Sequence, residues 1–267
     1  MLKDVTMGQY FPGTTVIHKL DPRTKLIFVV LYIIILFTAK WFVSYGVVFL
    51  FLVWVIAASK ISIKTILRSL KPLLFIIILT GVLNLFYTQG TPVLAFWIFT
   101  ITKEGIMAAI FMVLRIGMLI AGTFMLTYTT SPISLTDGLE GLLSPLKKLR
   151  VPVHELAMMM CIALRFIPTL IEETDKIMSA QKARGADFET GNLIRRAKAL
   201  IPILVPLFIS AFRRADELSV AMECRCYHGG DGRTKLKQLI FDKRDYFAFV
   251  LGLLLLIAII MLRYFDL

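Results

Sequence analysis

Cysteine is scarce in this 267-residue chain, and the common catalytic and nucleotide-binding motifs are missing from it. Three cysteines give no disulfide framework and are typical of a reducing, cytoplasm-facing location. The glycine-rich stretch Gly229–Lys235 lacks the Gly-x-x-x-x-Gly-Lys-Ser/Thr pattern of a phosphate-binding loop, so the chain is not expected to bind ATP itself. There is also no His-Glu-x-x-His motif, no Gly-x-Ser-x-Gly motif and no paired set of acids. The sequence therefore predicts no catalytic residue and no bound cofactor.

The sequence also lacks a complete set of metal ligands. Cys224, Cys226 and His228 lie close together, but their spacing places Cys226 on a different helix face from the other two. Structural zinc sites use four ligands, and no fourth ligand is evident nearby. We therefore expect no metal site in this chain.

Apolar residues, by contrast, make up 58% of the chain, and the mean hydropathy is +0.79. An ordinary globular protein is about 45–50% apolar, so a soluble domain is excluded. A net charge of +12 is compatible with nucleic acid binding, but the basic residues lie between apolar runs on alternate sides. This is the positive-inside pattern of an integral membrane protein, and it predicts a lipid membrane rather than nucleic acid as the partner. Because Met1–Lys19 is polar without an apolar core, no cleaved signal peptide is expected.

Five apolar runs are candidates for transmembrane helices. They are Leu26–Ala39, Trp41–Ser59, Leu73–Thr88, Gly105–Thr129 and Tyr246–Leu262. A span needs roughly 20 residues, so the first run has to borrow flanking residues. We expect a cytoplasmic basic loop over residues 60–71, an external loop with the short apolar run Val93–Ile101, and Arg263 on the outside. The chain is therefore predicted to be a multi-pass protein of the cell membrane.

One charge, Arg115, lies inside the fourth predicted span. A charge inside a span costs several kcal/mol by translocon scales and usually faces protein or water. One interpretation is a structural arginine satisfied by another helix or subunit, and the other is a substrate or ion path. The structural interpretation is favoured, because the spans offer almost no acidic partner.

Between the fourth and fifth spans the chain becomes strongly charged. Three domains are predicted: an N-terminal membrane domain of about four transmembrane helices (residues 1–130), a cytoplasmic helical coupling domain (131–245) and a C-terminal transmembrane helix (246–267). The charged domain keeps two apolar stretches, Leu156–Ile171 and Ala199–Phe212, which are short for spans and contain proline. We expect an all-α integral membrane protein whose two apolar stretches begin two long, kinked coupling helices of about 30 residues, near 45 Å each.

Each long helix is predicted to end in an arginine between small residues. The two ends repeat one plan at a constant offset: Asp175 and Asp216, Ala180 and Ala221, Arg184 and Arg225. The flanks are Ala183 and Gly185 in the first copy and Cys224 and Cys226 in the second. Basic residues are also favoured near helix C-termini by the helix dipole alone. Two copies in the same register favour two equivalent docking ends, since arginine pairs with carboxylates through a planar fork.

Longer stretches of the chain resemble the transmembrane T subunit of energy-coupling factor transporters, the EcfT or CbiQ-like family. The resemblance extends over nearly the whole chain, and the stretches that carry it are Tyr10–Gly13, His18–Arg23, Leu135–Leu149, Val151–Glu155, Leu164–Leu170 and Ala180–Gly185. In that family the T subunit joins two ATP-binding-cassette ATPases (EcfA and EcfA′-like) to a membrane-embedded S component that captures a vitamin or trace metal. ATP is bound by the ATPases and not by the T subunit.

The resemblance implies that Arg184 and Arg225 dock in grooves on the two ATPases, with Ala183, Gly185, Cys224 and Cys226 as close-packing flanks. Cys-Arg-Cys departs from the more usual Ala-Arg-Gly of the family, so glycine is not required there as a left-handed helix cap. The implied function is a non-enzymatic scaffold that transmits ATP-driven motion to the S component. The Met158–Met160 run suits a surface for varied partners, or else fills gaps in a helix interface.

Two rival functions come from other classes. A membrane-embedded transferase holding a phosphate at Arg115 or Arg165 would need acidic metal ligands or a nucleophile near the membrane face, and the spans contain almost none. A self-contained carrier would repeat its spans and place polar residues at the midplane, whereas the repeat here lies in the charged arms.

Overall fold

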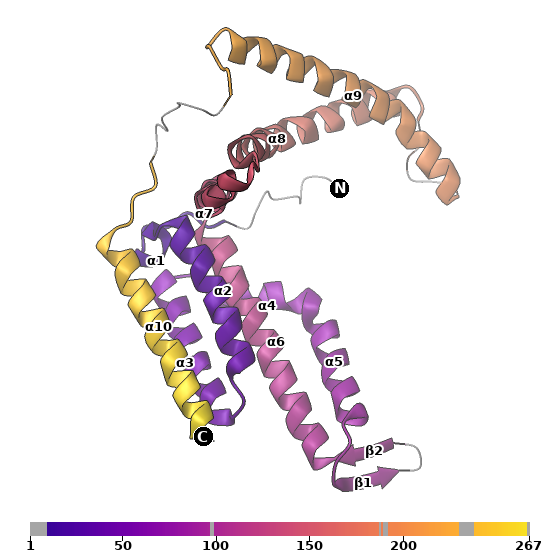
Figure 1. Cartoon of the computed structure of the whole chain (residues 1–267). Coiled ribbons are helices and arrows are strands. Elements are labelled where there is room, and N and C mark those ends of the chain that lie inside the picture. Colours follow the sequence, from indigo (N-terminus) through magenta and orange to yellow (C-terminus); the bar gives the residue numbers. More distant parts are fainter. Residues whose placement is uncertain (1–9, 97–98, 187, 189–191, 230–237, 266–267) are drawn as a thin grey trace. The chain divides into compact units, whose positions relative to one another are not determined.

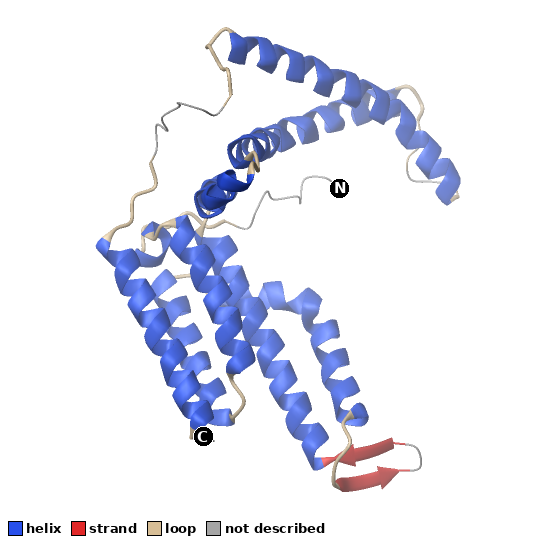
Figure 2. Cartoon of the chain, viewed as in Figure 1, coloured by secondary structure: helices blue, strands red, loops and turns tan. Residues whose placement is uncertain are grey.

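The computed structural model describes residues 10–96, 99–186, 188, 192–229 and 238–265. Their regular secondary structure is helical apart from one two-stranded hairpin, which confirms the predicted all-α fold class (Figure 2). The chain divides into two compact units. The bundle unit comprises Gly8–Leu139 and Leu239–Leu267, and the arm unit comprises Glu140–Gln238.

The bundle unit contains most of the helices that Figure 1 shows in indigo, magenta and yellow. They are α1 (Val16–Lys19), α2 (Pro22–Thr38), α3 (Phe42–Ser59), α4 (Ile63–Leu70), the 3₁₀ turn η1 (Lys71–Leu73), α5 (Leu74–Tyr87), α6 (Lys103–Thr129) and α10 (Lys243–Tyr264). Strands β1 (Pro92–Phe96) and β2 (Phe99–Thr102) pair antiparallel between α5 and α6. The apolar run predicted as part of an external loop is therefore a hairpin. Helix α7 (Pro132–Leu143) contains the boundary between the two units.

Within the described ranges, five helices are long and apolar enough to cross a membrane, so the chain is a multi-pass membrane protein. They are Phe42–Ser59, Ile63–Tyr87, Lys103–Thr129, Val153–Ala183 and Lys243–Tyr264. The number of candidate spans agrees with the prediction, but Val153–Ala183 takes the place of the predicted span Leu26–Ala39. Helix α2 has only 17 residues, about 26 Å at 1.5 Å per residue, which agrees with the expectation that this span borrows flanking residues. Helix α8 qualifies by length and composition, although its apolar stretch taken alone is too short.

The predicted basic loop over residues 60–71 is wrong, because most of this segment is the helix α4. Ile63, Ile66, Leu67 and Leu70 recur at the i, i+3, i+4, i+7 spacing of an amphipathic helix. Ile66 is buried in the bundle core, whereas Leu67 is exposed. Pro72 lies in η1, where it joins α4 to α5 instead of starting a separate helix.

The core of the bundle unit lies between α2, α3, α6 and α10. Its fully buried apolar side chains include Ile35, Leu36, Val48, Tyr128 and Ile259. Helices α2 and α6 approach closely at Gly122, where an added Cβ would overlap the Tyr32 ring. Small residues that let helix backbones approach are typical of membrane helix packing.

Polar contacts hold one end of this bundle, where α2 and α10 begin. The Asp245 carboxylate accepts hydrogen bonds from the Asp21 amide at 2.9 Å and from the Asp242 amide at 2.8 Å. The second of these belongs to the capping box of α10. The Lys25 ammonium donates to the Thr129 carbonyl at 2.8 Å, which ties the start of α2 to the end of α6.

The N-terminal segment, predicted only as polar, is part of this bundle from residue 10 onwards. The Phe11 amide donates to the Tyr128 carbonyl at 3.0 Å, and the Phe11 ring packs edge-on against Tyr128. His18 lies between the Thr15 hydroxyl and the Phe11 carbonyl, at 2.7 and 3.1 Å.

The arm unit consists of the 3₁₀ helix η2 (Ser144–Leu149) and the long helices α8 (Val153–Ala183) and α9 (Leu193–Glu223). Both long helices have 31 residues, about 46 Å, and contain internal prolines: Pro168 in α8, Pro202 and Pro206 in α9. The prediction of two long helices with internal prolines is therefore confirmed. Figure 1 shows α9 passing across α8, and the two helices are in contact.

Candidate docking site at two matched helix ends

The end of α8 places Arg184 at the C-cap, one residue before a left-handed turn. The Gly185 amide donates to the Lys182 carbonyl and the Ala186 amide to the Gln181 carbonyl, both at 3.0 Å. These two bonds define a Schellman motif, whose residue after the cap takes the left-handed conformation. Gly185 does so at φ +87°.

The end of α9 repeats these bonds atom for atom. The Cys226 amide donates to the Glu223 carbonyl at 2.8 Å and the Tyr227 amide to the Met222 carbonyl at 3.0 Å. Counted from these bonds, Arg225 is the C-cap, and Cys226 takes the left-handed conformation at φ +58°. The second end is therefore a Schellman motif with its arginine at the same position.

The two ends differ in the residue that forms the left-handed turn. Glycine adopts this turn without a steric penalty, whereas an L-residue such as Cys226 costs about 1–2 kcal/mol. The sequence indicated correctly that glycine is not required, but the left-handed cap itself is retained. The docking residues predicted from the sequence are all exposed: Ala183, Arg184, Gly185, Cys224, Arg225 and Cys226. Both arginines are accessible to a partner.

An ionic contact joins the two long helices where they meet. The Glu173 carboxylate of α8 accepts a hydrogen bond from the Ser210 hydroxyl at 2.6 Å and from the Arg214 guanidinium at 2.9 Å. The Glu173 side chain is 24% exposed and that of Arg214 is 39% exposed. Charge-assisted bonds of this kind restrict how the two helices slide past one another.

The contact occurs between equivalent positions of the repeat. The offset that relates Arg184 to Arg225 also relates Glu173 to Arg214. Arg184 and Arg225 are thus each eleven residues, about 16 Å of helix, beyond the contact on their own arm. Sequence reasoning missed this pair, although opposite charges at one repeat position were a usable signal.

Before this contact, both long helices expose large apolar side chains. On α8 these are Leu156, Met159, Met160 and Ile167; on α9 they are Ile194, Leu200, Ile201, Leu204, Val205, Phe208, Ile209 and Phe212. Exposed apolar surface of this extent marks a protein or membrane interaction site rather than an ordinary solvated face. Met159 and Met160 of the predicted adaptable run are 54% and 45% exposed, and Met158 is partly buried.

The two ends offer exposed guanidinium groups for ion pairing. Across the part of the chain that the structure describes, three or more His, Cys, Asp or Glu side chains nowhere gather as a metal site would require. Cys224 and Cys226 are exposed free thiols. Most of the glycine-rich stretch that follows them, residues 230–235, lies outside the described residues. A guanidinium at each helix end, flanked by small residues, can enter a groove and pair with a carboxylate.

Arg115, the charge inside a predicted span, contacts neighbouring helices of the bundle unit. Its Nε donates to the Tyr45 hydroxyl at 2.8 Å, and its guanidinium lies 5.6 Å from the Phe37 ring centroid. A further hydrogen bond reaches the Ala39 carbonyl at 3.4 Å. These contacts support the structural interpretation over a substrate path.

Comparison with known proteins gives consistent results. Residues 13–236 match the CbiQ family, described as "Cobalt transport protein". The chain is 55% identical over 265 residues to the energy-coupling factor transporter transmembrane protein EcfT of Clostridium kluyveri, covering 98% of each chain. It is 54% identical over 263 residues to EcfT of Thermosediminibacter oceani (98% of this chain, 99% of the relative). With EcfT of Bacillus subtilis it shares 46% identity over 261 residues (97% and 98%). The chain therefore belongs to the CbiQ family, among the transmembrane proteins of energy-coupling factor transporters called EcfT.

Proposed function

We propose that this chain is the coupling scaffold of an energy-coupling factor importer for vitamins or other micronutrients. It joins two ABC ATPase subunits to a substrate-binding S component and transmits the ATP-driven motion between them. The observation that carries this proposal is the matched pair of helix ends, each with an exposed arginine at the same position of a Schellman motif. Two equal ends fit two docking grooves of similar shape.

The two caps fix the direction of each arginine through the backbone. In each motif the last carbonyls of the helix are bonded by the two residues after the cap, so the end of the helix cannot fray without breaking these bonds. A rigid end transfers force to its helix, whereas a frayed end absorbs it. Arg184 and Arg225 therefore serve as docking points that move together with α8 and α9.

The contact between Glu173, Ser210 and Arg214 lies between these docking points and the apolar halves. When the ATPases close on ATP, the docked ends approach each other and the helices turn about this contact. The exposed apolar halves then press on the S component, and their methionines repack against different S components. ATP is bound by the ATPases, and this chain needs no cofactor of its own.

The arm unit is placed in the cytoplasm in this proposal, and the bundle unit in the cell membrane. The positive-inside pattern supports this placement. The relatives carry the name of a transporter membrane protein, which supports a transport role over that of a membrane-embedded transferase.

Charge reversal at the docking arginines tests the proposal. The variants Arg184→Glu, Arg225→Glu and the double variant are compared in two assays: recovery of the ATPases with the purified chain, and substrate uptake by whole cells. Truncating one partner of a buried charge pair costs about 2–5 kcal/mol, and a reversal costs at least as much, so each single variant should weaken docking by at least about 30-fold.

Arg213→Glu provides the matched control, because Arg213 is an exposed arginine on α9 far from the end. It should leave assembly and uptake near the wild-type level. Normal assembly and uptake of the double variant would show that both arginines are solvated charges without a docking role.

A further inference from the structure

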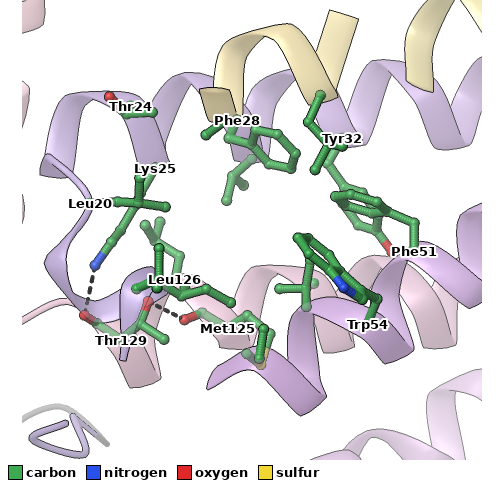
Figure 3. Close-up of a pocket in the computed structure, with 18 of the residues that line it drawn as sticks. Leu20, Thr24, Lys25, Phe28, Tyr32, Phe51, Trp54, Met125, Leu126 and Thr129 are labelled. Atoms are coloured by element: carbon green, nitrogen blue, oxygen red, sulfur yellow. Dashed lines mark hydrogen bonds between the residues drawn. The ribbon is translucent and has the colours of Figure 1, made fainter. Parts of the chain in front are cut away.

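The bundle unit contains an apolar cavity of about 300 Å³ between α1, α2, α3, α6 and α10 (Figure 3). Aromatic side chains form much of its wall: Phe28 and Tyr32 from α2, Phe51 and Trp54 from α3, Phe247 from α10. The cavity is not closed off from its surroundings, since Trp54 is 53% exposed and Phe247 is 65% exposed. Its opening therefore lies among helices that span the membrane.

The two cations that line the cavity differ in how they are bonded. The Lys25 ammonium bonds to the Thr129 carbonyl, the Thr130 hydroxyl and the His18 carbonyl, as Figure 3 shows for Thr129. Its charge is satisfied by the protein. Arg244 instead has a side chain that is 47% exposed, and its Nε lies 3.6 Å from the Asp242 carboxylate.

The cavity runs inward from the level of Arg244. Arg244 lies in the first turn of α10, and Leu251 lines the cavity seven residues deeper, about 10 Å along the helix. On α2 the lining likewise extends from Thr24 to Tyr32. Its long dimension is therefore parallel to the spans, with the cation at one end.

The wall of this cavity is almost wholly apolar, so hydrocarbon is its natural occupant in a bilayer. Basic pockets between transmembrane helices on the cytoplasmic side bind the head groups of anionic lipids. Exposed Lys19 and Lys243 lie at the same end of the bundle as Arg244. We propose that the cavity holds one acyl chain of an anionic phospholipid from the cytoplasmic leaflet, with the lipid phosphate at Arg244.

Such a lipid would fill the space between α10 and the helices α2 and α3, and so hold the C-terminal span against the first two. This proposal rests on the membrane location of the bundle and not on the coupling role of the arms. Its failure would therefore leave the proposed function untouched.

Quenching of Trp54 by brominated acyl chains tests the proposal directly. Trp41→Phe and Trp97→Phe leave Trp54 as the single tryptophan of the full chain, which is then reconstituted in bilayers of phosphatidylcholine. Dibrominated phosphatidylglycerol or dibrominated phosphatidylcholine is added at equal, low mole fraction. We expect phosphatidylglycerol to reach half-maximal quenching at about fivefold lower mole fraction.

Three variants separate the parts of the proposed site. Arg244→Gln should abolish the preference for phosphatidylglycerol, and Ala248→Phe, which adds a ring inside the cavity, should reduce quenching by both lipids. Val250→Phe adds comparable bulk to an exposed face of α10 that does not line the cavity, and it should behave as the wild type. Native mass spectrometry of the whole transporter complex should show one retained phosphatidylglycerol, lost in Ala248→Phe.

Two results would overturn the proposal. Equal quenching by the two lipids in the wild type would mean that Trp54 only contacts bulk lipid. A complex that retains no lipid, while the isolated chain does, would mean that a partner subunit occupies the cavity instead.

Discussion

The left-handed cysteine at the end of α9 gives a prediction with a definite sign. Cys226 has φ +58°, and an L-residue in this region costs about 1–2 kcal/mol that glycine does not. Glycine has more freedom to lose on ordering, about 0.5–1 kcal/mol, which offsets part of that gain. Cys226→Gly should therefore stabilise the cap by about 1 kcal/mol. Since about 1.4 kcal/mol is a factor of ten, local opening should become about fivefold rarer.

Hydrogen exchange measures this opening at the amides that close the motif. The Tyr227 amide bonds to the Met222 carbonyl, so its exchange in Cys226→Gly should slow by about fivefold. Gly185→Ala is the reciprocal change and should speed exchange of the Ala186 amide by a similar factor. Both amides are followed by mass spectrometry on the peptides that cover the two ends.

Cys224→Gly provides a control of opposite sign two residues away. Cys224 has φ −60° in the right-handed helical region, where glycine is destabilising, so exchange there should quicken. Unchanged or faster exchange at Tyr227 in Cys226→Gly would refute the left-handed cap at this end.

Three further predictions concern other contacts. Glu173→Gln should weaken substrate uptake while leaving recovery of the ATPases near the wild-type level. The charge exchange Glu173→Arg with Arg214→Glu should restore uptake relative to either single variant. If the exchange does not restore uptake, this contact has no role in coupling. Gly122→Ala places a methyl against the Tyr32 ring and should lower the free energy of unfolding by about 1–3 kcal/mol, seen as a lower thermal midpoint, whereas Gly46→Ala, where space is open, should not. Burial, and to a lesser degree the Lys25 charge, lowers the pKa of His18 below 6.5, although the hydrogen bond to the Phe11 carbonyl opposes this shift. The unfolded chain therefore takes up the proton at higher pH than the folded chain, and stability is lost as pH falls below 6.5. The pH dependence of the thermal midpoint between 6.5 and 5.5 should be smaller in His18→Gln, and an identical dependence would contradict this assignment.

Membrane spans were predictable because bilayer thickness imposes a length and composition that a single apolar run displays. Helix α4 was missed because its four apolar residues alternate with Lys64 and Arg68, and positive charge was taken as the mark of a loop. The i, i+3, i+4, i+7 spacing of these apolar residues was the signal that indicated a helix. A charge count alone does not distinguish a loop from a helix lying at the membrane surface.

Part of the candidate site could likewise be predicted from the sequence, and part could not. The two arginines and their flanks could be found because a repeat with constant offset is visible in one sequence. The left-handed turn at Cys226 could not, since cysteine has no preference for that conformation and only the backbone bonds reveal it. The docking of Phe11 on Tyr128 also depends on tertiary packing that no local pattern encodes.

The contact of Glu173 with Arg214 has a consequence for how the two arms can differ. Glu173 and Arg214 are equivalent positions of the repeat that contact each other, as residues near the axis of an isologous interface do. Identical arms would place two glutamates or two arginines against each other there, which is repulsive. Opposite charges at this position make the contact attractive instead. The difference between the two copies of the repeat therefore adds an ionic attraction between the arms.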